Sequence, residues 1–290
     1  MHPAPSIIAF TTLSGLGFGL LVWLGIDPDP PTGLVGFAFF AIAFALSGGG
    51  LLFSAFHLGR KERALKAFTQ WRSSWLSREA WAAAGALGVS GLYALALVVF
   101  GAHIAPIGWL SALLCLVTVF ATSMIYAQLR TVPRWHHWST PALFLLLSVS
   151  GGALLSGRIV EGGVGLALAG ALQLYVWIDG DRRLAGSGST LATATGLGSM
   201  GGTLRAFEPP HTGSNYVMRE MAYRVARKHA LKLRVIALLL MAVVPVLCLS
   251  LPFSHILAAL AVLCHILGVF AARWLFFAEA EHVAGLYYGR

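Results

Sequence analysis

Long apolar runs dominate this sequence and limit the folds that are open to it. A helix needs about 20 mainly apolar residues to cross the hydrocarbon core of a bilayer. Eight runs approach or exceed that length: 6–26, 33–56, 80–101, 106–128, 140–157, 161–178, 235–251 and 254–278. Only 11% of the 290 residues are charged, against about 25% in a soluble domain. Because the runs are apolar on all faces, we predict an all-α membrane protein, a bundle of eight transmembrane helices, and not a barrel.

The chain is predicted to form a single integral membrane domain, residues 1–290, with two long polar connections, 57–79 and 179–234. The first run has no basic stretch before it and no convincing cleavage site after it, so we expect a retained helix and not a signal peptide. Within the second connection, 186–202 is a flexible low-complexity stretch. Residues 215–234 are predicted to form a basic helix that touches lipid or an acidic partner.

Basic residues sort to one side of the predicted bundle. Eight crossings place both termini on one side, here called side A, together with the connections 57–79, 129–139 and 179–234. All of the 20 Lys and Arg residues except Arg158 fall on side A, when Arg273 near the C-terminal end is counted. The positive-inside rule therefore predicts a multi-pass protein of the bacterial inner membrane with both termini in the cytoplasm. The excess charge also suits the anionic lipid bilayer, and without a soluble basic domain we expect no nucleic acid partner.

The first connection, HLGRKERALKAFTQWRSSWLSRE (57–79), gathers polar and aromatic residues. Ala64, Phe68, Trp71 and Trp75 recur at i, i+4, i+7 and i+11, while the other face is basic. This pattern predicts an amphipathic helix in the membrane interface after the second span. A purely structural role also explains the tryptophans, because Trp side chains are enriched at the depth of the lipid headgroups.

Two ionisable residues flank this interfacial segment. His57 ends the second apolar run and Glu79 begins the third, at similar depth. A His and a carboxylate suit a quinone head, whose hydroxyl protons need an acceptor. Arg60, Trp71 as an aromatic lid and Gly49 in a glycine-rich wall complete the predicted quinone site. The alternatives are a His that caps free carbonyls, an acid favoured by the helix dipole, and glycines that serve close helix packing.

Haem and metal sites are not expected in this chain. His265 lies near the middle of the eighth run without a partner at the same depth, whereas haem between two helices needs paired histidines. Cys115, Cys248 and Cys264 stand singly in apolar runs, which indicates buried thiols and not a cluster site. We predict no metal ligands and no catalytic residues.

Several long motifs, in the same order, make this chain similar to a known family. HPAPSIIAFTTLSGLGFGLL, HLGRKERALKAFTQWRSSWLSRE, FEPPHTGSNYVMREMAYRVARKHALKLR and RWLFFAEAEHVAGLYYG together resemble the membrane anchor subunit of the dimethyl sulfoxide reductase family. The resemblance spans nearly the whole chain. It implies eight spans, no haem, and a complex with a molybdopterin catalytic subunit and an iron–sulfur electron-transfer subunit that hold the metal centres. It also implies that His57 and Glu79 are quinol-site residues.

The expected function is therefore that of a non-catalytic anchor subunit, which exchanges electrons between quinol (menaquinol or ubiquinol) and the iron–sulfur subunit. The direction of electron flow is left open, with a lean to the reductase. The basic residues of the first connection are predicted to dock that subunit: Arg60, Lys61, Arg63 and Arg72. One alternative is the anchor of a cytoplasmic sulfite dehydrogenase that passes electrons to quinone. Others are a passive tether, or a transporter, for which Gln173 and His265 offer a sparse polar path.

Overall fold

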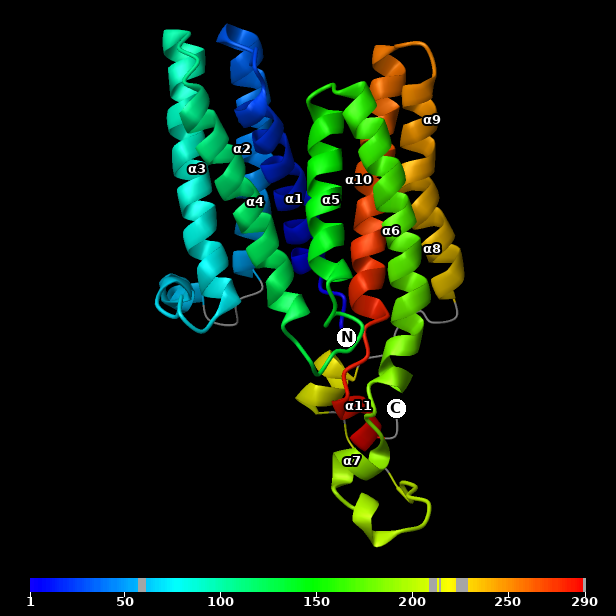
Figure 1. Ribbon diagram of the computed structural model, residues 1–290. Coiled ribbons are helices and arrows are strands. Elements are labelled where there is room, and N and C mark those ends of the chain that lie inside the picture. Colours follow the sequence, from blue (N-terminus) through cyan, green and yellow to red (C-terminus); the bar gives the residue numbers. More distant parts are fainter. Residues whose placement is uncertain (57–60, 209–212, 214, 223–228, 289–290) are drawn as a thin grey trace.

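The computed structural model describes residues 1–56, 61–208, 213, 215–222 and 229–288, and gives residues 56 and 61–63 as backbone alone. Every regular element in this described part is a helix, and the long helices run side by side as a bundle (Figure 1). The long helices are α1 (Pro5–Ile26), α2 (Gly33–Phe56), α3 (Trp75–Phe100), α4 (Ala105–Ala127), α5 (Ser139–Leu155), α6 (Ile159–Gly186), the continuous rod of α8 (Ala230–Leu238), η5 (Leu239–Val243) and α9 (Val244–Ser250), and α10 (His255–Ala278). The predicted all-α fold is confirmed.

Seven helical segments of the described chain are long and apolar enough to cross a bilayer. α5 is also apolar but has only 17 residues, so the predicted count of eight spans is not confirmed and stays a prediction. α5 nevertheless packs along α1, α4, α6 and α10. Large apolar side chains such as Leu34, Phe100 and Ile256 remain exposed on the outer faces, as expected for helices that contact lipid and not water.

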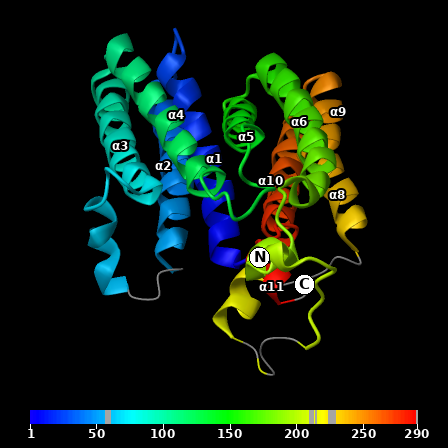
Figure 2. The same ribbon diagram turned by 60° about the horizontal axis from the view of Figure 1, so that its bottom comes forward.

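α1 lies at the centre of the bundle, with α2 and α4 on one side and α5 and α10 on the other (Figure 2). In its most apolar stretch 72% of the residues are buried, against 56% in α4 and at most 33% in the other candidate spans. Glycines permit this close approach: a Cβ on Gly19 would lie 1.8 Å from the carbonyl oxygen of Ser148 on α5, and one on Gly17 would lie 2.3 Å from the backbone nitrogen of Ser47 on α2. Backbone contact through glycine is how membrane helices pack tightly.

Both termini lie at the same end of the bundle, the lower end in Figure 1, which is side A. The same end carries the short elements η1 (Lys61–Phe68), α7 (Leu191–Thr195), η2 (Gly198–Met200), η3 (Val217–Met221) and α11 (Ala284–Tyr287). One residue departs from the predicted charge sorting. Arg273 is 4% exposed within α10, so it belongs to the bundle interior and not to the charged surface of side A.

The connection between α2 and α3 differs from the amphipathic α-helix expected through Trp75. η1 is a 3₁₀-helix that ends at Phe68, residues 69–73 form turns, and Trp75 instead begins α3. A tertiary contact accompanies this difference: the indole Nε1 of Trp81 donates to the carbonyl oxygen of Phe68 at 3.0 Å. The two rings also pack edge to face, with centroids 5.2 Å apart.

The basic helix expected over residues 215–234 is present only in part. η3 is a single π-helical turn, and α8 begins at Ala230. Residues 223–228, between these two elements, lie outside the described residues.

Four charged side chains join the C-terminal half of the bundle at side A. Arg234 on α8 contacts both Asp181 on α6, at 2.6 and 2.7 Å, and Glu279 at the end of α10, at 2.7 Å. Arg134, in the connection between α4 and α5, forms ion pairs with the same two acids. Networked charges with shared partners hold geometry better than isolated surface pairs do. The network therefore fixes α6, α8 and α10 relative to one another.

Candidate functional site

Glu79 lies inside the bundle, not at its surface. It sits just over one turn into α3 and is 4% exposed. Its carboxylate oxygen Oε1 makes a short hydrogen bond with the hydroxyl of Thr122 on α4. Ionisable residues buried within spans are costly and mark functional positions, so the structure singles out this carboxyl group.

The Thr122 hydroxyl can serve either protonation state of Glu79. Its oxygen also lies 3.0 Å from the carbonyl oxygen of Thr118, one turn earlier on α4. A hydroxyl has one proton to donate and can accept in turn. When Glu79 is ionised, Thr122 donates to it; when Glu79 is protonated, it can donate to Thr122, which then donates to Thr118. The pair is therefore suited to a carboxyl group that gains and loses a proton.

Aromatic and basic side chains hold the start of α3 in place. The guanidinium of Arg78 donates to the carbonyl oxygens of Trp71, at 3.0 Å, and Arg72, at 2.7 Å. Its Cζ lies 4.4 Å from the ring centroid of Trp75, and that ring packs edge-on against Phe120 of α4, at 5.9 Å. These contacts fix the turn that leads into Glu79.

The other residues predicted for the quinone site are placed as follows. His57 and Arg60 lie outside the described residues. Trp71 is 56% exposed. Gly49 is half-buried on α2, and a Cβ there would meet nothing within 4 Å. The described contacts do not join Trp71 or Gly49 to Glu79, so their role in the site stays a prediction.

The glycines on either side of Gly49 differ in the space around them. A Cβ on Gly50 would lie 2.5 Å from the backbone nitrogen of Ser14, so this glycine serves close packing of α2 on α1. A Cβ on Gly48, like one on Gly49, would meet open space. Open space beside two adjacent glycines is compatible with the predicted ligand wall but does not test it.

For partner docking, Arg72 is exposed at side A, as the prediction requires. Lys61 and Arg63 are described only as backbone within η1, and Arg60 lies outside the described residues. The predicted docking residues are therefore untested.

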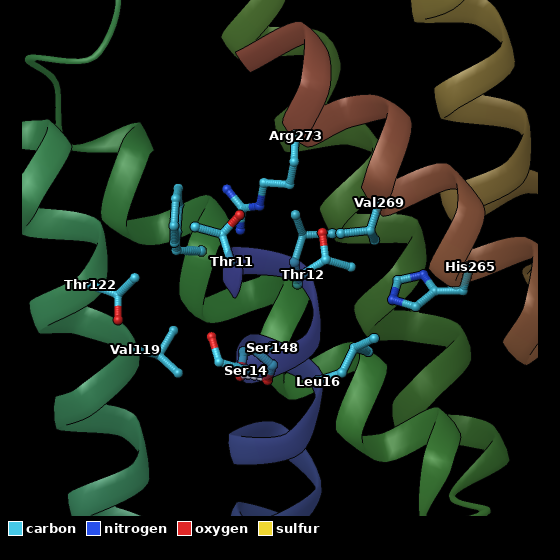
Figure 3. Close-up of a pocket in the computed structure, with 13 residues that line it drawn as sticks. Thr11, Thr12, Ser14, Leu16, Val119, Thr122, Ser148, His265, Val269 and Arg273 are labelled. Carbon is cyan, nitrogen blue, oxygen red and sulfur yellow. Dashed lines mark hydrogen bonds between the residues drawn. The ribbon is translucent and has the colours of Figure 1, made fainter. Parts of the chain in front are cut away.

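A small polar cavity lies between α1, α4, α5 and α10 (Figure 3). Its volume is about 20 Å³, enough for about one water molecule. Thirteen residues line it: Thr11, Thr12, Ser14, Gly15, Leu16, Val119, Thr122, Phe144, Leu147, Ser148, His265, Val269 and Arg273. Thr122 is thus a partner of Glu79 and a wall of the polar cavity at once.

Three buried polar atoms of the cavity have no hydrogen-bond partner in the described part of the chain: Thr12 Oγ1, His265 Nε2 and Arg273 Nε. In Figure 3, His265 and Arg273 extend from α10 toward α1, and the Arg273 guanidinium lies beside Thr11 in this view. Buried polar atoms without partners cost free energy, and one cavity that collects several of them needs an explanation.

The orientation of His265 has a local cause in the rod of α8, η5 and α9. Pro245 has no backbone N–H, so the carbonyl of Met241, four residues earlier, loses its helical partner. The Nδ1 atom of His265 lies 2.7 Å from that carbonyl oxygen. Since a carbonyl only accepts, Nδ1 carries the proton, and Nε2 faces the cavity as an acceptor. The π-helical turn η5 at this point (Leu239–Val243) is of the kind often found at functional sites.

The polar cavity was not predicted from the sequence, although a signal was present. Thr11, Thr12 and Ser14 cluster on one apolar run, and Thr118 and Thr122 recur at i and i+4 on another. Hydroxyl residues are easily read as neutral filler in a membrane helix. Their spacing nevertheless marks the buried faces of α1 and α4.

Metal and haem sites were not expected in this chain. The described residues contain no group of three or more His, Cys, Asp or Glu side chains placed to hold a metal ion. The three cysteines are free thiols, two of them buried. The absence of haem stays a prediction.

Comparison with known proteins adds two matches. A family model described as "DMSO reductase anchor subunit (DmsC)" matches residues 5–174. That stretch covers α1 to α5 and most of α6, and so includes Glu79 and Thr122, but not α10. The chain is also 31% identical, over 326 aligned residues and 99% of both chains, to a sulfite dehydrogenase subunit of Allochromatium vinosum (strain ATCC 17899).

Proposed function

Because the chain belongs to the DMSO reductase anchor subunit (DmsC) family, we propose that it anchors a molybdenum-dependent oxidoreductase in the membrane and exchanges electrons between quinone and an iron–sulfur subunit. The observation that carries the quinone proposal is the buried carboxyl group of Glu79 with its Thr122 partner, close to side A. The catalytic subunit, which holds molybdopterin, and the iron–sulfur subunit are the proposed partners. Their metal centres carry the electrons, and this chain supplies the quinone site.

Proton exchange is the chemistry that this site would perform. Interconverting quinone and quinol moves a pair of protons together with a pair of electrons, so the site needs groups that hold and release protons near the quinone oxygens. Glu79 can do so while it keeps its contact with Thr122. His57 is proposed as the second such group, since a histidine titrates near neutral pH. Menaquinone and ubiquinone both fit this chemistry.

Two observations favour electron flow from the soluble subunits to quinone. The relative from Allochromatium vinosum is named as a subunit of a sulfite dehydrogenase, and a dehydrogenase delivers electrons. The basic residues on side A predict that this side is cytoplasmic. We therefore favour the anchor of a cytoplasmic sulfite-oxidising enzyme in a bacterial inner membrane over a dimethyl sulfoxide reductase.

Substituting Glu79 tests the quinone site. Glu79→Gln keeps the size of the side chain and removes its exchangeable proton, so quinone-linked turnover should fall about 10²- to 10⁴-fold. Sulfite oxidation with an artificial electron acceptor, which bypasses the membrane subunit, should continue at the normal rate. Glu161→Gln, in a half-exposed acid at the start of α6 on the opposite side, is the matched control and should leave both rates unchanged.

A normal quinone-linked rate in assembled Glu79→Gln complex would reject the quinone role and leave a passive tether. His57→Ala, assayed in the same way, tests the second proposed proton carrier.

Reversing the charges of Arg60, Lys61, Arg63 and Arg72 should weaken co-purification of the iron–sulfur subunit. Unchanged co-purification would remove these residues from the docking surface.

The proposed orientation is tested with reporters fused to the C-terminus. Alkaline phosphatase is active only after export, whereas a green fluorescent protein fusion folds in the cytoplasm. We expect fluorescence and no phosphatase activity. An active phosphatase fusion would place side A outside and favour an exported reductase.

A further inference from the structure

Arg273 is a buried cation with no opposite charge beside it. The side chain lies on α10 and is 4% exposed. The ion pairs of the described residues do not include it, and its Nε atom has no hydrogen-bond partner there. Its Cζ lies 3.5 Å from the ring centroid of Phe144 on α5, but a ring contact is weaker than a paired charge. A guanidinium stays protonated in proteins, so the charge of Arg273 has to be balanced in another way.

The walls of the polar cavity supply no acid for this cation. Buried charges within membrane helices are almost always paired. The four helices that enclose the cavity, α1, α4, α5 and α10, carry no Asp or Glu. Glu79 on α3 bonds Thr122 and does not line the cavity. Glu279, which follows α10, is held in the charge network of side A.

The cavity does supply a further hydrogen-bond donor. Thr12 is 1% exposed, and its Oγ1 atom has no partner among the described residues, so its proton is available. The Thr11 hydroxyl, by contrast, donates to carbonyl oxygens of its own helix, at 3.0 and 3.2 Å. In Figure 3 the Arg273 guanidinium lies at a similar height to both threonines, whereas the His265 ring lies lower. This part of the cavity therefore combines a full positive charge with a free hydroxyl donor.

Size limits what the cavity can hold. Its volume is about 20 Å³, whereas sites for organic ligands measure about 300–1,000 Å³. A lipid phosphate and a quinone head are therefore both too large. A water molecule fits but carries no charge, so it leaves the guanidinium unbalanced. A halide ion is only slightly larger than a water molecule and carries the missing charge.

We propose that Arg273 and Thr12 bind a small monovalent anion of halide size, chloride under ordinary conditions, in the polar cavity. Arg273 supplies the opposite charge and N–H donors, and Thr12 supplies an O–H donor. Hydrogen bonds to an ion are stronger than those between neutral groups. Arg273 lies five residues, about 8 Å, before the end of α10 at side A, which shortens the path of an ion from water. The bound anion joins α10 to α1, so its binding stabilises their packing.

Exchanging the anion tests this inference in the unmodified chain. The full chain in lipid nanodiscs is dialysed into sodium gluconate, whose anion is too large for the cavity, and sodium bromide then replaces gluconate at constant ionic strength. A ligand that binds only the folded state raises the melting temperature, so we expect a rise with bromide concentration. Anomalous diffraction should place one bromide ion within hydrogen-bond distance of the Arg273 guanidinium. An unchanged melting temperature, or water in place of bromide, would overturn the inference.

Variants of the chain locate the effect. Arg273→Gln should abolish the bromide-dependent rise, whereas Arg273→Lys keeps the charge and should retain part of it. Thr12→Val removes one donor, so the rise should need about tenfold more bromide. Arg183→Gln, which removes a cation paired with Asp179 on α6, is the matched control and should leave the rise unchanged.

A rise of normal size in Arg273→Gln would place the ion elsewhere and overturn the inference. If Arg273→Gln does not fold, the position of bromide in the unmodified chain and the bromide requirement of Thr12→Val decide the question. None of these measurements involves quinone turnover, so the inference and the proposed function can fail separately.

Discussion

Replacing Thr122 by valine isolates the hydrogen bond to Glu79 with almost no change in shape. Valine puts a methyl group where the hydroxyl was, so packing between α3 and α4 is preserved while the carboxyl group loses its described partner. A hydrogen bond to a charged group contributes about 1.5–3 kcal/mol. The protonated form loses a neutral hydrogen bond of about 1 kcal/mol, so the ionised form loses about 0.5–2 kcal/mol more. Since about 1.4 kcal/mol corresponds to a factor of ten, the ionised form of Glu79 becomes about 2- to 30-fold less accessible.

Thr118 provides the matched control one turn away on the same helix. Its hydroxyl donates to the carbonyl oxygen of Leu114, at 2.8 Å, within its own helix. It is as deeply buried as Thr122, so Thr118→Val repeats the chemical change without touching Glu79. If Glu79 exchanges protons with quinone, the two variants should separate sharply in quinone-linked turnover.

The assay compares two rates for each variant of the assembled complex. We expect Thr122→Val to lose about 2- to 30-fold in quinone-linked turnover, with an unchanged rate to an artificial acceptor, while Thr118→Val keeps both rates. If Thr122→Val turns over quinone at the normal rate, or if both variants lose the same amount, the reasoning from the Thr122 hydrogen bond is refuted.

Two other predictions concern the packing and the charges of the bundle. Gly19→Ala forces α1 away from α5, so it should destabilise the protein by about 3 kcal/mol in thermal unfolding. Gly91→Ala, where a Cβ meets open space, is the control and should not. Equal melting temperatures for the two variants would contradict the close contact. Arg234→Gln leaves Asp181 and Glu279 short of a partner and should lower the free energy of unfolding by about 1–2 kcal/mol, less than for a fully buried pair because the site is partly exposed. Arg234→Lys should recover part of this loss. A fully stable Arg234→Gln would show that the network is dispensable.

The presence and approximate positions of the long helices could be predicted from the sequence, but not the faces that they bury. An apolar run of sufficient length is a strong signal because every backbone polar group in a bilayer must be bonded within the segment. The spans are apolar on all sides, however, so no periodicity distinguishes the inner face of α3 from the outer one. That Glu79 points at Thr122 therefore depends on helix packing, to which a single sequence gives only weak clues.

The connection before α3 departs from its local pattern at a point where a tertiary contact is made. The spacing of Phe68, Trp71 and Trp75 favours an α-helix, and locally nothing argues against one. Trp81, which belongs to the following helix, takes the carbonyl of Phe68, and α3 begins at Trp75, earlier than the apolar run suggests. Arg273 shows a similar limit: counting basic residues by side ignores burial, and so assigned an interior cation to the surface.

The polar cavity also bears on what the last spans contribute. The match to the anchor family ends at residue 174, before α8 and α10, and Glu79 with Thr122 lies within the matched part. The polar cavity is closed by α10, and His265 within it is oriented by Met241 of the preceding rod. Thr122 therefore joins the carboxyl group of Glu79 to the wall of a cavity that the C-terminal helices complete.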